Sequence, residues 1–280
     1  MYLQLDSDDI KIYYEAIGDG IPVVIIHGFY PDHRLMKGCL EPVFQNNPGF
    51  RRYYFDLPGM GKTVAAGKIE SSDAIFSAVL EFILKILGDS ERFLVIGESY
   101  GGYLTRALIS KMTQRIRGMM LLCPVIFPDP LKRELPQHAI FKCDEKSVEN
   151  LCGSDKSRFC NDMVIQDART ISRFKEEILP GVNAADAETL ERIWQSSYGF
   201  SFNVDEISGL DAPSLIITGK NDHIVGYRDA YRELLKIYPR ATYAALDMAG
   251  HYLQIERPIL FEALVADWLA RVVEKPESHL

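Results

Sequence analysis

Short apolar runs alternate with longer helical patterns along most of this 280-residue chain. Runs typical of strands occur at 10–17, 23–28, 51–56, 92–97, 119–123, 214–219 and 241–247, and we expect 10–17 to be an edge strand. Apolar residues recur at the three- and four-residue spacing of helices in 33–45, 71–87, 100–115, 226–237 and the segment from Pro258 onward. Strands that alternate with helices predict a mostly parallel sheet covered by helices on both faces.

The alternation breaks between residues 124 and 205. This stretch has few strand-like runs and several helical patterns, including 167–179 and 186–197, which are interrupted by prolines and glycines. We therefore predict an α/β core formed by residues 1–123 and 206–280, with a helical insertion at 124–205 between one strand and its successor.

Charge and apolar patterning exclude several classes of function. The formal net charge is −8, so we expect no nucleic-acid partner and no attraction to anionic membranes. The apolar runs are too short to span a bilayer, and the first residues lack the pattern of a secretory signal. Five cysteines without paired spacing favour neither a disulfide framework nor a zinc site. We expect a cytoplasmic protein without a metal or organic cofactor.

The segment GMGKT at 59–63 is similar to the end of a phosphate-binding loop. That loop requires glycine five residues before Gly61, and the chain has Asp56 there. A carboxylate at this position would repel the phosphates that the loop must hold. We therefore interpret 56–63 as a turn after a strand and reject nucleotide binding.

The segment VIGESYGG at 95–102 joins a predicted strand to a predicted helix. It contains G-x-S-x-G, with Ser99 at the centre and glycines at 97, 101 and 102. A nucleophilic serine on a strained turn stands clear of the sheet, and small neighbours two residues away leave room for that turn. The N–H groups of the following helix are directed at a developing oxyanion. We predict that Ser99 is a catalytic nucleophile.

A serine nucleophile needs a base and an acid that orients the base. His251 follows the last predicted strand, and Asp222 follows the strand at 214–219, which is the chain order expected after such a serine. Asp211, before that strand, and Asp247, four residues before the base, are the alternative acids. We expect the oxyanion to be held by the backbone N–H groups of Phe29 and Tyr100.

We expect structural rather than catalytic roles for His27 and for a short polar sequence after it. His27 precedes the turn that contains Phe29, and we expect it to stabilise that turn rather than to act as a second base. The sequence Asp32, His33, Arg34 follows shortly after, and we expect it to form the exposed start of a helix.

These residues together resemble the α/β-hydrolase superfamily. The resemblance covers nearly the whole chain and rests on HGF at 27–29, DLPGMGKT at 56–63, GESYGG at 97–102, NDHIV at 221–225 and AGH at 249–251. The family often has serine where this chain has Thr63. The resemblance implies an α/β-hydrolase fold, with a mostly parallel eight-stranded sheet and 124–205 as a helical cap, or lid. It implies a Ser-His-Asp serine hydrolase of the esterase or proline iminopeptidase kind.

The substrate is less constrained by the sequence. Glu98, Trp194 and Tyr198 are our candidate substrate-binding residues, although a structural role for Glu98 is favoured. Acids of the insertion lie mostly beside basic residues, which argues against a site for a substrate amine, whereas its aromatic residues suit an apolar pocket. We therefore expect a small-molecule carboxylic ester as substrate. An aminopeptidase and a ligand receptor without turnover are the alternatives, and the oligomeric state stays open.

Overall fold

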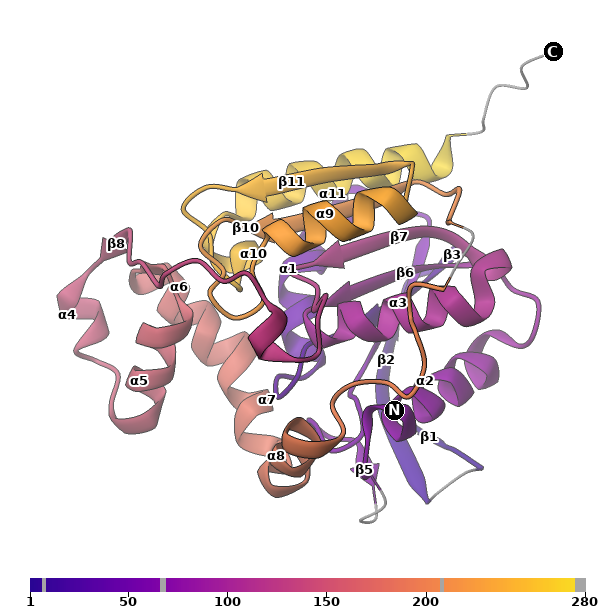
Figure 1. Ribbon diagram of the computed structural model, residues 1–280, viewed down its shortest axis with the longest axis horizontal. Coiled ribbons are helices and arrows are strands. Elements are labelled where there is room, and N and C mark those ends of the chain that lie inside the picture. Colours follow the sequence, from indigo (N-terminus) through magenta and orange to yellow (C-terminus); the bar gives the residue numbers. More distant parts are fainter. Residues whose placement is uncertain (7–8, 66–68, 207–208, 275–280) are drawn as a thin grey trace.

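In the computed structural model, which describes residues 1–6, 9–65, 69–206 and 209–274, one sheet runs through the core (Figure 1). Its strands follow the order β1-β2-β4-β3-β6-β7-β10-β11. Their bounds are β1 Tyr2–Gln4, β2 Ile10–Ile17, β3 Ile21–Ile26, β4 Phe50–Phe55, β6 Phe93–Glu98, β7 Ile116–Leu122, β10 Ser214–Gly219 and β11 Ala241–Leu246. The strands from β4 to β11 are parallel, and β1 and β2 are antiparallel.

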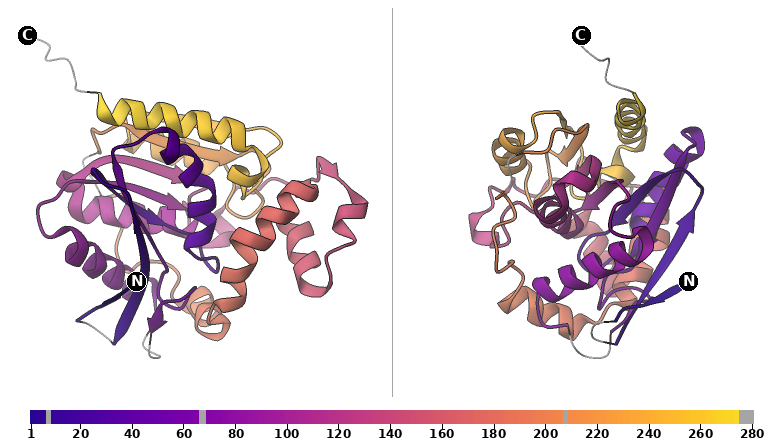
Figure 2. Two further views of the ribbon diagram at one scale, coloured as in Figure 1. Left: turned by 180° about the vertical axis from the view of Figure 1, so that it is seen from behind. Right: turned by 90° about the vertical axis from the view of Figure 1, so that its right-hand side faces the viewer.

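Helices cover both faces of this sheet (Figures 1 and 2). Helices α2 (Ser72–Leu87), α3 (Tyr100–Met112) and α9 (Arg228–Ile237) lie on one face, and α1 (His33–Asn46) and α11 (Pro258–Val273) pack together on the other. All six residues of β6 are buried, as expected for a central parallel strand. The predicted α/β-hydrolase fold is confirmed.

Two details of the sheet differ from the prediction. The segment 10–17 is not an edge strand, because β1 pairs with its outer side in an antiparallel register. The sheet also has a ninth strand, the two-residue β5 (Val64–Ala65), which pairs with β2. Strands of two or three residues are too short to show an alternating pattern, so the sequence gives no signal for them.

The segment 124–205 is mainly helical and lies beside the carboxyl ends of the parallel strands (Figure 1). It contains α4 (Glu145–Val148), α5 (Gly153–Asp162), α6 (Ala168–Arg173), η3 (Phe174–Ile178), α7 (Leu179–Ala184) and α8 (Ala187–Ser196), a 3-10 turn η2 (Pro130–Lys132), and a strand pair β8 (Lys142–Cys143) and β9 (Ile165–Gln166). We call this segment the helical insertion.

The helical insertion has a small apolar core of its own. Phe159 and Phe174 are fully buried, with ring centroids 5.3 Å apart, and the cluster extends to Leu35 of α1 and to Tyr252 and Ile255 near α10 (Leu253–Glu256). The division at 124 and 205 stays a prediction. Residues 207–208 and 275–280 of the predicted core lie outside the described residues. Within the described ranges, no helix is both long and apolar enough to cross a membrane.

Candidate active site

Ser99 lies on a strained turn between β6 and α3. Its backbone has φ +54° and ψ −114°, in a region that non-glycine residues rarely adopt. A Cβ atom at Gly97 would lie 2.3 Å from the Gly101 carbonyl oxygen, and one at Gly101 would lie 2.3 Å from the Ile26 carbonyl oxygen. Both glycines are therefore required by the close approach of the backbone, as the G-x-S-x-G pattern predicts.

Two loops bring an imidazole and a carboxylate together near this turn. Asp222 follows β10 and His251 follows β11, and His251 Nδ1 lies 2.8 Å from Asp222 Oδ2. The other oxygen, Asp222 Oδ1, accepts the backbone N–H groups of Ile224 and Val225 at 2.9 and 3.0 Å. Asp222 is fully buried and His251 is 5% exposed. Three hydrogen bonds thus fix the carboxylate against the ring.

The ionisation of this pair is set by burial and by mutual attraction. Burial alone would raise the pKa of Asp222, but the adjacent His251 charge and the hydrogen bonds hold it below its usual value. Burial alone would lower the pKa of His251, but Asp222, with a further contribution from Glu98, raises it to about 9. The pair therefore favours an imidazolium held by a carboxylate.

The alternative acids lie elsewhere. Asp211 is 89% exposed at the opposite edge of the sheet, where one oxygen lies 4.0 Å from Arg240 Nε. Asp247 is exposed, and its backbone carbonyl oxygen accepts a hydrogen bond from Arg257. Of the three candidate acids, Asp222 is the one in contact with His251.

The two expected oxyanion donors flank Ser99. Phe29 follows β3, Tyr100 begins α3, and their rings meet edge to face with centroids 5.0 Å apart. Among the described residues, neither backbone N–H has a hydrogen-bond acceptor. His27 stabilises this turn, as expected: its Nδ1 lies 2.7 Å from the Gly28 oxygen, and its Nε2 accepts the Leu57 N–H at 3.0 Å.

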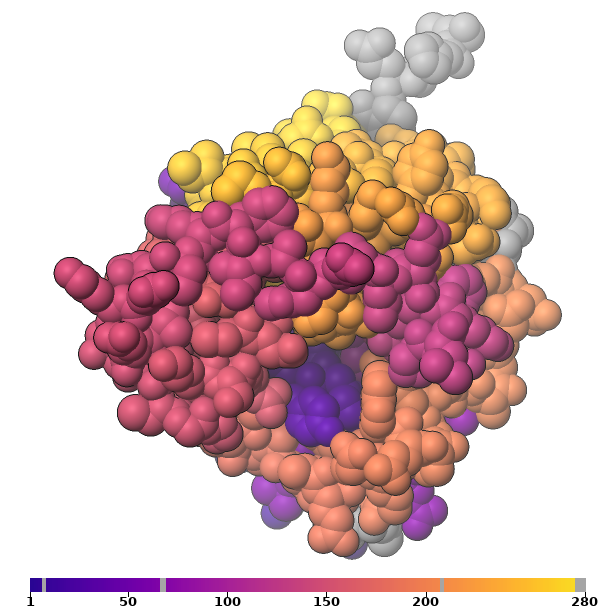
Figure 3. Space-filling view, turned by 60° about the vertical axis from the view of Figure 1, so that its left-hand side comes forward, coloured from indigo at the N-terminus to yellow at the C-terminus, as the bar shows by residue number. Residues whose placement is uncertain are grey.

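A cavity of about 250 Å³ opens over Ser99 and His251. Figure 3 shows the opening, with atoms from early in the chain at its floor and residues of the helical insertion around it. Of the proposed substrate-binding residues, Trp194 and Tyr198 line this cavity, whereas Glu98 is buried behind it and 1% exposed. Burial raises the pKa of Glu98 to about 7, and the charge of His251 opposes this effect.

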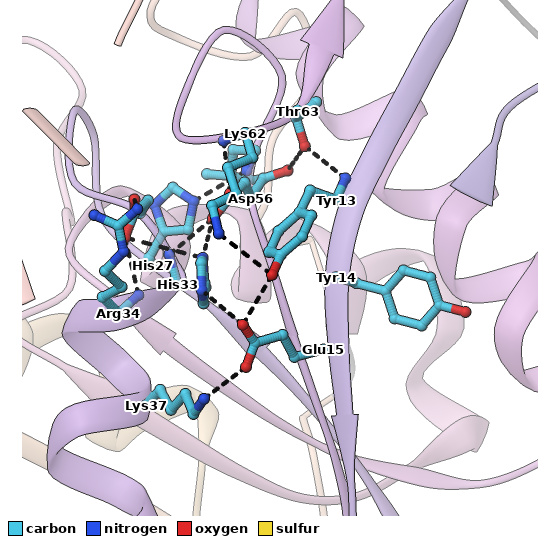
Figure 4. Close-up of polar contacts among 12 residues, drawn as sticks. Tyr13, Tyr14, Glu15, His27, His33, Arg34, Lys37, Asp56, Lys62 and Thr63 are labelled. Carbon is cyan, nitrogen blue, oxygen red and sulfur yellow. Dashed lines mark hydrogen bonds and ion pairs between the residues drawn. The ribbon is translucent and has the colours of Figure 1, made fainter. Parts of the chain in front are cut away.

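In the turn at 56–63, a carboxylate takes up backbone N–H groups of the kind that a phosphate-binding loop would offer. The Asp56 carboxylate accepts the backbone N–H groups of His33 at 2.9 Å and Lys62 at 2.8 Å (Figure 4). A Cβ atom at Gly61 would lie 2.4 Å from the same carboxylate. The Lys62 ammonium lies 4.5 Å from the centroid of the Tyr13 ring. Asp56 thus organises the turn, and Thr63 extends it by donating its hydroxyl to the Asp56 carbonyl oxygen at 2.6 Å.

The expected exposure of residues 32–34 is wrong for two of the three. Asp32 is fully buried as the N-cap of α1, where it accepts the Arg34 N–H at 3.0 Å. His33 is 3% exposed and lies between two carboxylates, 2.7 Å from Asp56 and 3.2 Å from Glu15 (Figure 4). These partners come from distant parts of the sequence, so local composition does not indicate the burial.

Two buried clusters have three potential metal-ligand atoms within 4.8 Å of one another: Cys123, Asp222 and His251, and Asp32, His33 and Asp56. In each cluster a histidine Nδ1 already contacts a carboxylate oxygen, at 2.8 and 2.7 Å respectively. Any ion bound there would have to displace that contact.

Comparison with known proteins agrees with this geometry. A family profile described as alpha/beta hydrolase fold matches residues 21–258. The chain belongs to the α/β-hydrolase family. An α/β superfamily hydrolase from Oenococcus oeni has 27% sequence identity and a TM-score of 0.87, with 98% of this chain and 100% of that chain covered.

Other α/β hydrolases similar to this one carry names of different activities. A 2-hydroxy-6-oxononadienedioate/2-hydroxy-6-oxononatrienedioate hydrolase from Cupriavidus pinatubonensis is 26% identical over 277 residues, which cover 94% of this chain and 92% of the relative. A non-heme chloroperoxidase from Kitasatospora aureofaciens is 23% identical, and the match covers 87% of this chain and 90% of the relative. The fold is also shared by a thermophilic esterase from Thermogutta terrifontis, with a TM-score of 0.66 and 20% sequence identity. The match covers 97% of this chain and 99% of the esterase.

The cavity of this α/β hydrolase also contains charged residues that the sequence interpretation missed. Arg133, Arg158, Asp162 and Glu191 line it, and all four come from the helical insertion. The acids considered from the sequence lie elsewhere; Glu134, for example, pairs with arginines of α9. Residues of separate short helices meet at the cavity only through tertiary packing, so sequence spacing gives no signal for them.

Proposed function

We propose that this α/β hydrolase is a serine hydrolase that cleaves carboxylic esters through an acyl-enzyme. One observation carries the proposal: Ser99, on its strained turn, and His251, whose Nδ1 lies 2.8 Å from Asp222, border the same cavity. A nucleophile, a base and an orienting carboxylate in this arrangement are what acyl transfer requires.

In the proposed reaction, Ser99 Oγ attacks the acyl carbon while His251 Nε2 accepts its proton. Asp222 keeps Nδ1 protonated and stabilises the imidazolium that forms. The N–H groups of Phe29 and Tyr100 donate to the developing oxyanion. The ring then transfers its proton to the leaving alkoxide. In the second half of the reaction, His251 accepts a proton from the attacking water and returns it to Ser99 Oγ as the acyl group leaves.

The cavity size supports a small or medium acyl group. Its volume of about 250 Å³ is below the roughly 300–1,000 Å³ of common small-molecule sites. Trp194 and Tyr198 supply aromatic surface, with ring centroids 4.7 Å apart. Two other aromatic residues of the insertion pack elsewhere: Phe159 lies in the apolar core of the insertion, and Phe200 stacks on Tyr103.

An aminopeptidase is the second candidate, because two carboxyl groups border the cavity. Asp162 is 8% exposed, with its pKa raised by burial, and Glu191 accepts from the Tyr30 hydroxyl at 3.5 Å. Such groups could hold a substrate amine. Arg133 and Arg158 offset their charge, so the lining as a whole is not selective for a cation.

A carbon–carbon bond hydrolase is favoured by a different observation. The relative from Cupriavidus pinatubonensis is named for a dienedioate, which is a dianion. Arg133 has no carboxylate partner among the described residues and donates to the carbonyl oxygens of Phe127, Pro128 and Ile224. A cation held in this way suits a carboxylate of the substrate.

The deciding experiment compares kcat/KM for p-nitrophenyl butyrate with that for proline and alanine p-nitroanilides. We expect the ester to be preferred. An anilide preference that Asp162→Asn abolishes, and that the exposed insertion variant Glu149→Gln retains, would establish the aminopeptidase instead. A single turnover without release of the acyl group would indicate a receptor.

A further inference from the structure

Glu98 contacts the ring of His251 on the side opposite Asp222. Its Oε1 lies 3.4 Å from His251 Nε2, while Nδ1 faces Asp222 at 2.8 Å. The imidazole is therefore bracketed by two buried carboxyl groups. Among the described residues, no hydrogen bond joins Ser99 Oγ to Nε2, and the carboxyl group that contacts Nε2 is that of Glu98.

The position of Glu98 is tightly confined. Both of its oxygens are buried and neither has a hydrogen bond of normal geometry among the described residues, although the nearby Gly28 backbone opposes the effect of burial on the pKa of the carboxyl group. A Cβ atom at residue 28 would lie 2.2 Å from Glu98 Oε2, so the carboxyl group packs directly against the backbone of Gly28. A buried carboxyl group without hydrogen bonds is costly, and its close contact with an imidazole is the interaction that can offset that cost.

We propose that Glu98 is a positioning residue that competes with Ser99 for Nε2 of His251 and so holds the base in a resting state. The inference rests on the proposed function, since it assigns the ring the role of general base.

A proton on Nε2 keeps the ring from acting as a base. Nδ1 keeps its proton for Asp222, and an ionised Glu98 carboxylate beside Nε2 favours a second proton on the ring. In this imidazolium, Nε2 cannot accept the proton of Ser99. The base becomes available when that proton leaves to solvent, and the negative charge of Glu98 raises the pH at which this happens.

Other ionisable groups lie close to Glu98 and His251 and also affect the pKa of each. Carboxyl groups face it from Asp222, from Asp162 of α5, and from Glu256 of α10, whose Oε2 accepts the Gly250 N–H at 2.6 Å. His223 adjoins Asp222, and burial lowers its pKa. The cations Arg133 and Arg158 line the same cavity as His251. Burial raises the pKa of four further neighbours, so they stay neutral near pH 7: Cys39, Cys123, Tyr198 and Tyr252. Asp222 already has its hydrogen bonds, which leaves Glu98 as the carboxyl group at Nε2.

The test measures the pH dependence of Ser99 labelling by a fluorophosphonate in wild type, Glu98→Gln and Glu98→Ala. We expect the wild-type rate to reach half its maximum near pH 9, as the raised pKa of His251 implies. Both variants should reach it at least about one pH unit lower, which is about tenfold faster labelling on the acid limb. The second variant serves if the first does not fold. Asp162→Asn is the matched control. Asp162 is also a buried carboxyl group, but among the described residues it has no ion pair or hydrogen bond with Nε2, so this variant should shift the midpoint less.

A histidine-ring NMR titration reads the His251 pKa without requiring catalysis, with the resonance assigned by comparison with His251→Gln. If neither substitution at Glu98 lowers this pKa, or if Asp162→Asn lowers it as much, the inference is wrong even where esters are hydrolysed. If the pKa falls but Ser99 is never labelled, Glu98 does control the protonation of the ring, and the proposed hydrolase function is what fails. A merely structural role would reduce labelling equally at every pH and leave the midpoint unchanged.

Discussion

Asp222→Asn removes the group that orients the base while keeping nearly the same shape. Asp222 Oδ1 accepts two backbone N–H groups, from Ile224 and Val225, so the amide oxygen of Asn must take that position. The amide nitrogen then faces His251 Nδ1, where the carboxylate oxygen lay at 2.8 Å. A donor at this place forces the ring into the tautomer with its proton on Nε2, which cannot accept the proton of Ser99.

The expected loss in kcat is about 10³- to 10⁴-fold, or roughly 4–5.5 kcal/mol at 1.36 kcal/mol per tenfold. The assay is p-nitrophenyl butyrate hydrolysis at pH 7 to 9, together with a thermal melt to show that the variant is folded. Asp247→Asn is the matched control, because Asp247 is exposed and lies four residues from His251. A loss of less than tenfold in Asp222→Asn, or a larger loss in the control, would refute the assignment of the acid.

Three further variants test the surrounding framework. Gly101→Ala should lower Tm, because its Cβ would lie 2.3 Å from the Ile26 carbonyl oxygen; an unchanged Tm in a thermal melt would contradict the close approach. Glu256→Ala should lower the free energy of unfolding, measured in urea, by several kcal/mol. It leaves the N–H groups of Val164, Ile165 and Gly250 unpaired, at about 1–3 kcal/mol each. Glu256→Gln keeps an acceptor and should cost less. Lys62→Ala should retain ester hydrolysis, and ATP should not raise Tm of the wild type; saturable stabilisation by ATP would revive a nucleotide site.

Much of the core was predictable because its signals are local. Residues 214–219 form β10 at the predicted bounds, and α11 begins at Pro258, where proline at the first helical turn needs no N–H partner. Ser71 caps α2 by accepting the Ala74 N–H, also a local interaction. The strained turn at Ser99 followed from its two flanking glycines.

The rest depends on contacts between distant segments. Helix α5 has only two buried residues, Phe159 and Asp162, so its sequence lacks an apolar stripe. Asp162 therefore gave no sign that it borders the cavity. The contact of Glu98 with His251 joins residues 153 positions apart, and the burial of His33 depends on Glu15 of β2. Composition near each residue cannot report such pairs.

The acyl-enzyme at Ser99 is the central intermediate of the proposed mechanism. The measurement is rapid-quench mass spectrometry of the intact protein during turnover of p-nitrophenyl butyrate, followed by peptide mapping of the adduct. We predict a butyryl group on the peptide that contains Ser99, and neither adduct nor turnover in Ser99→Ala. An adduct on a different residue, or undiminished ester hydrolysis by Ser99→Ala, would contradict the proposed mechanism.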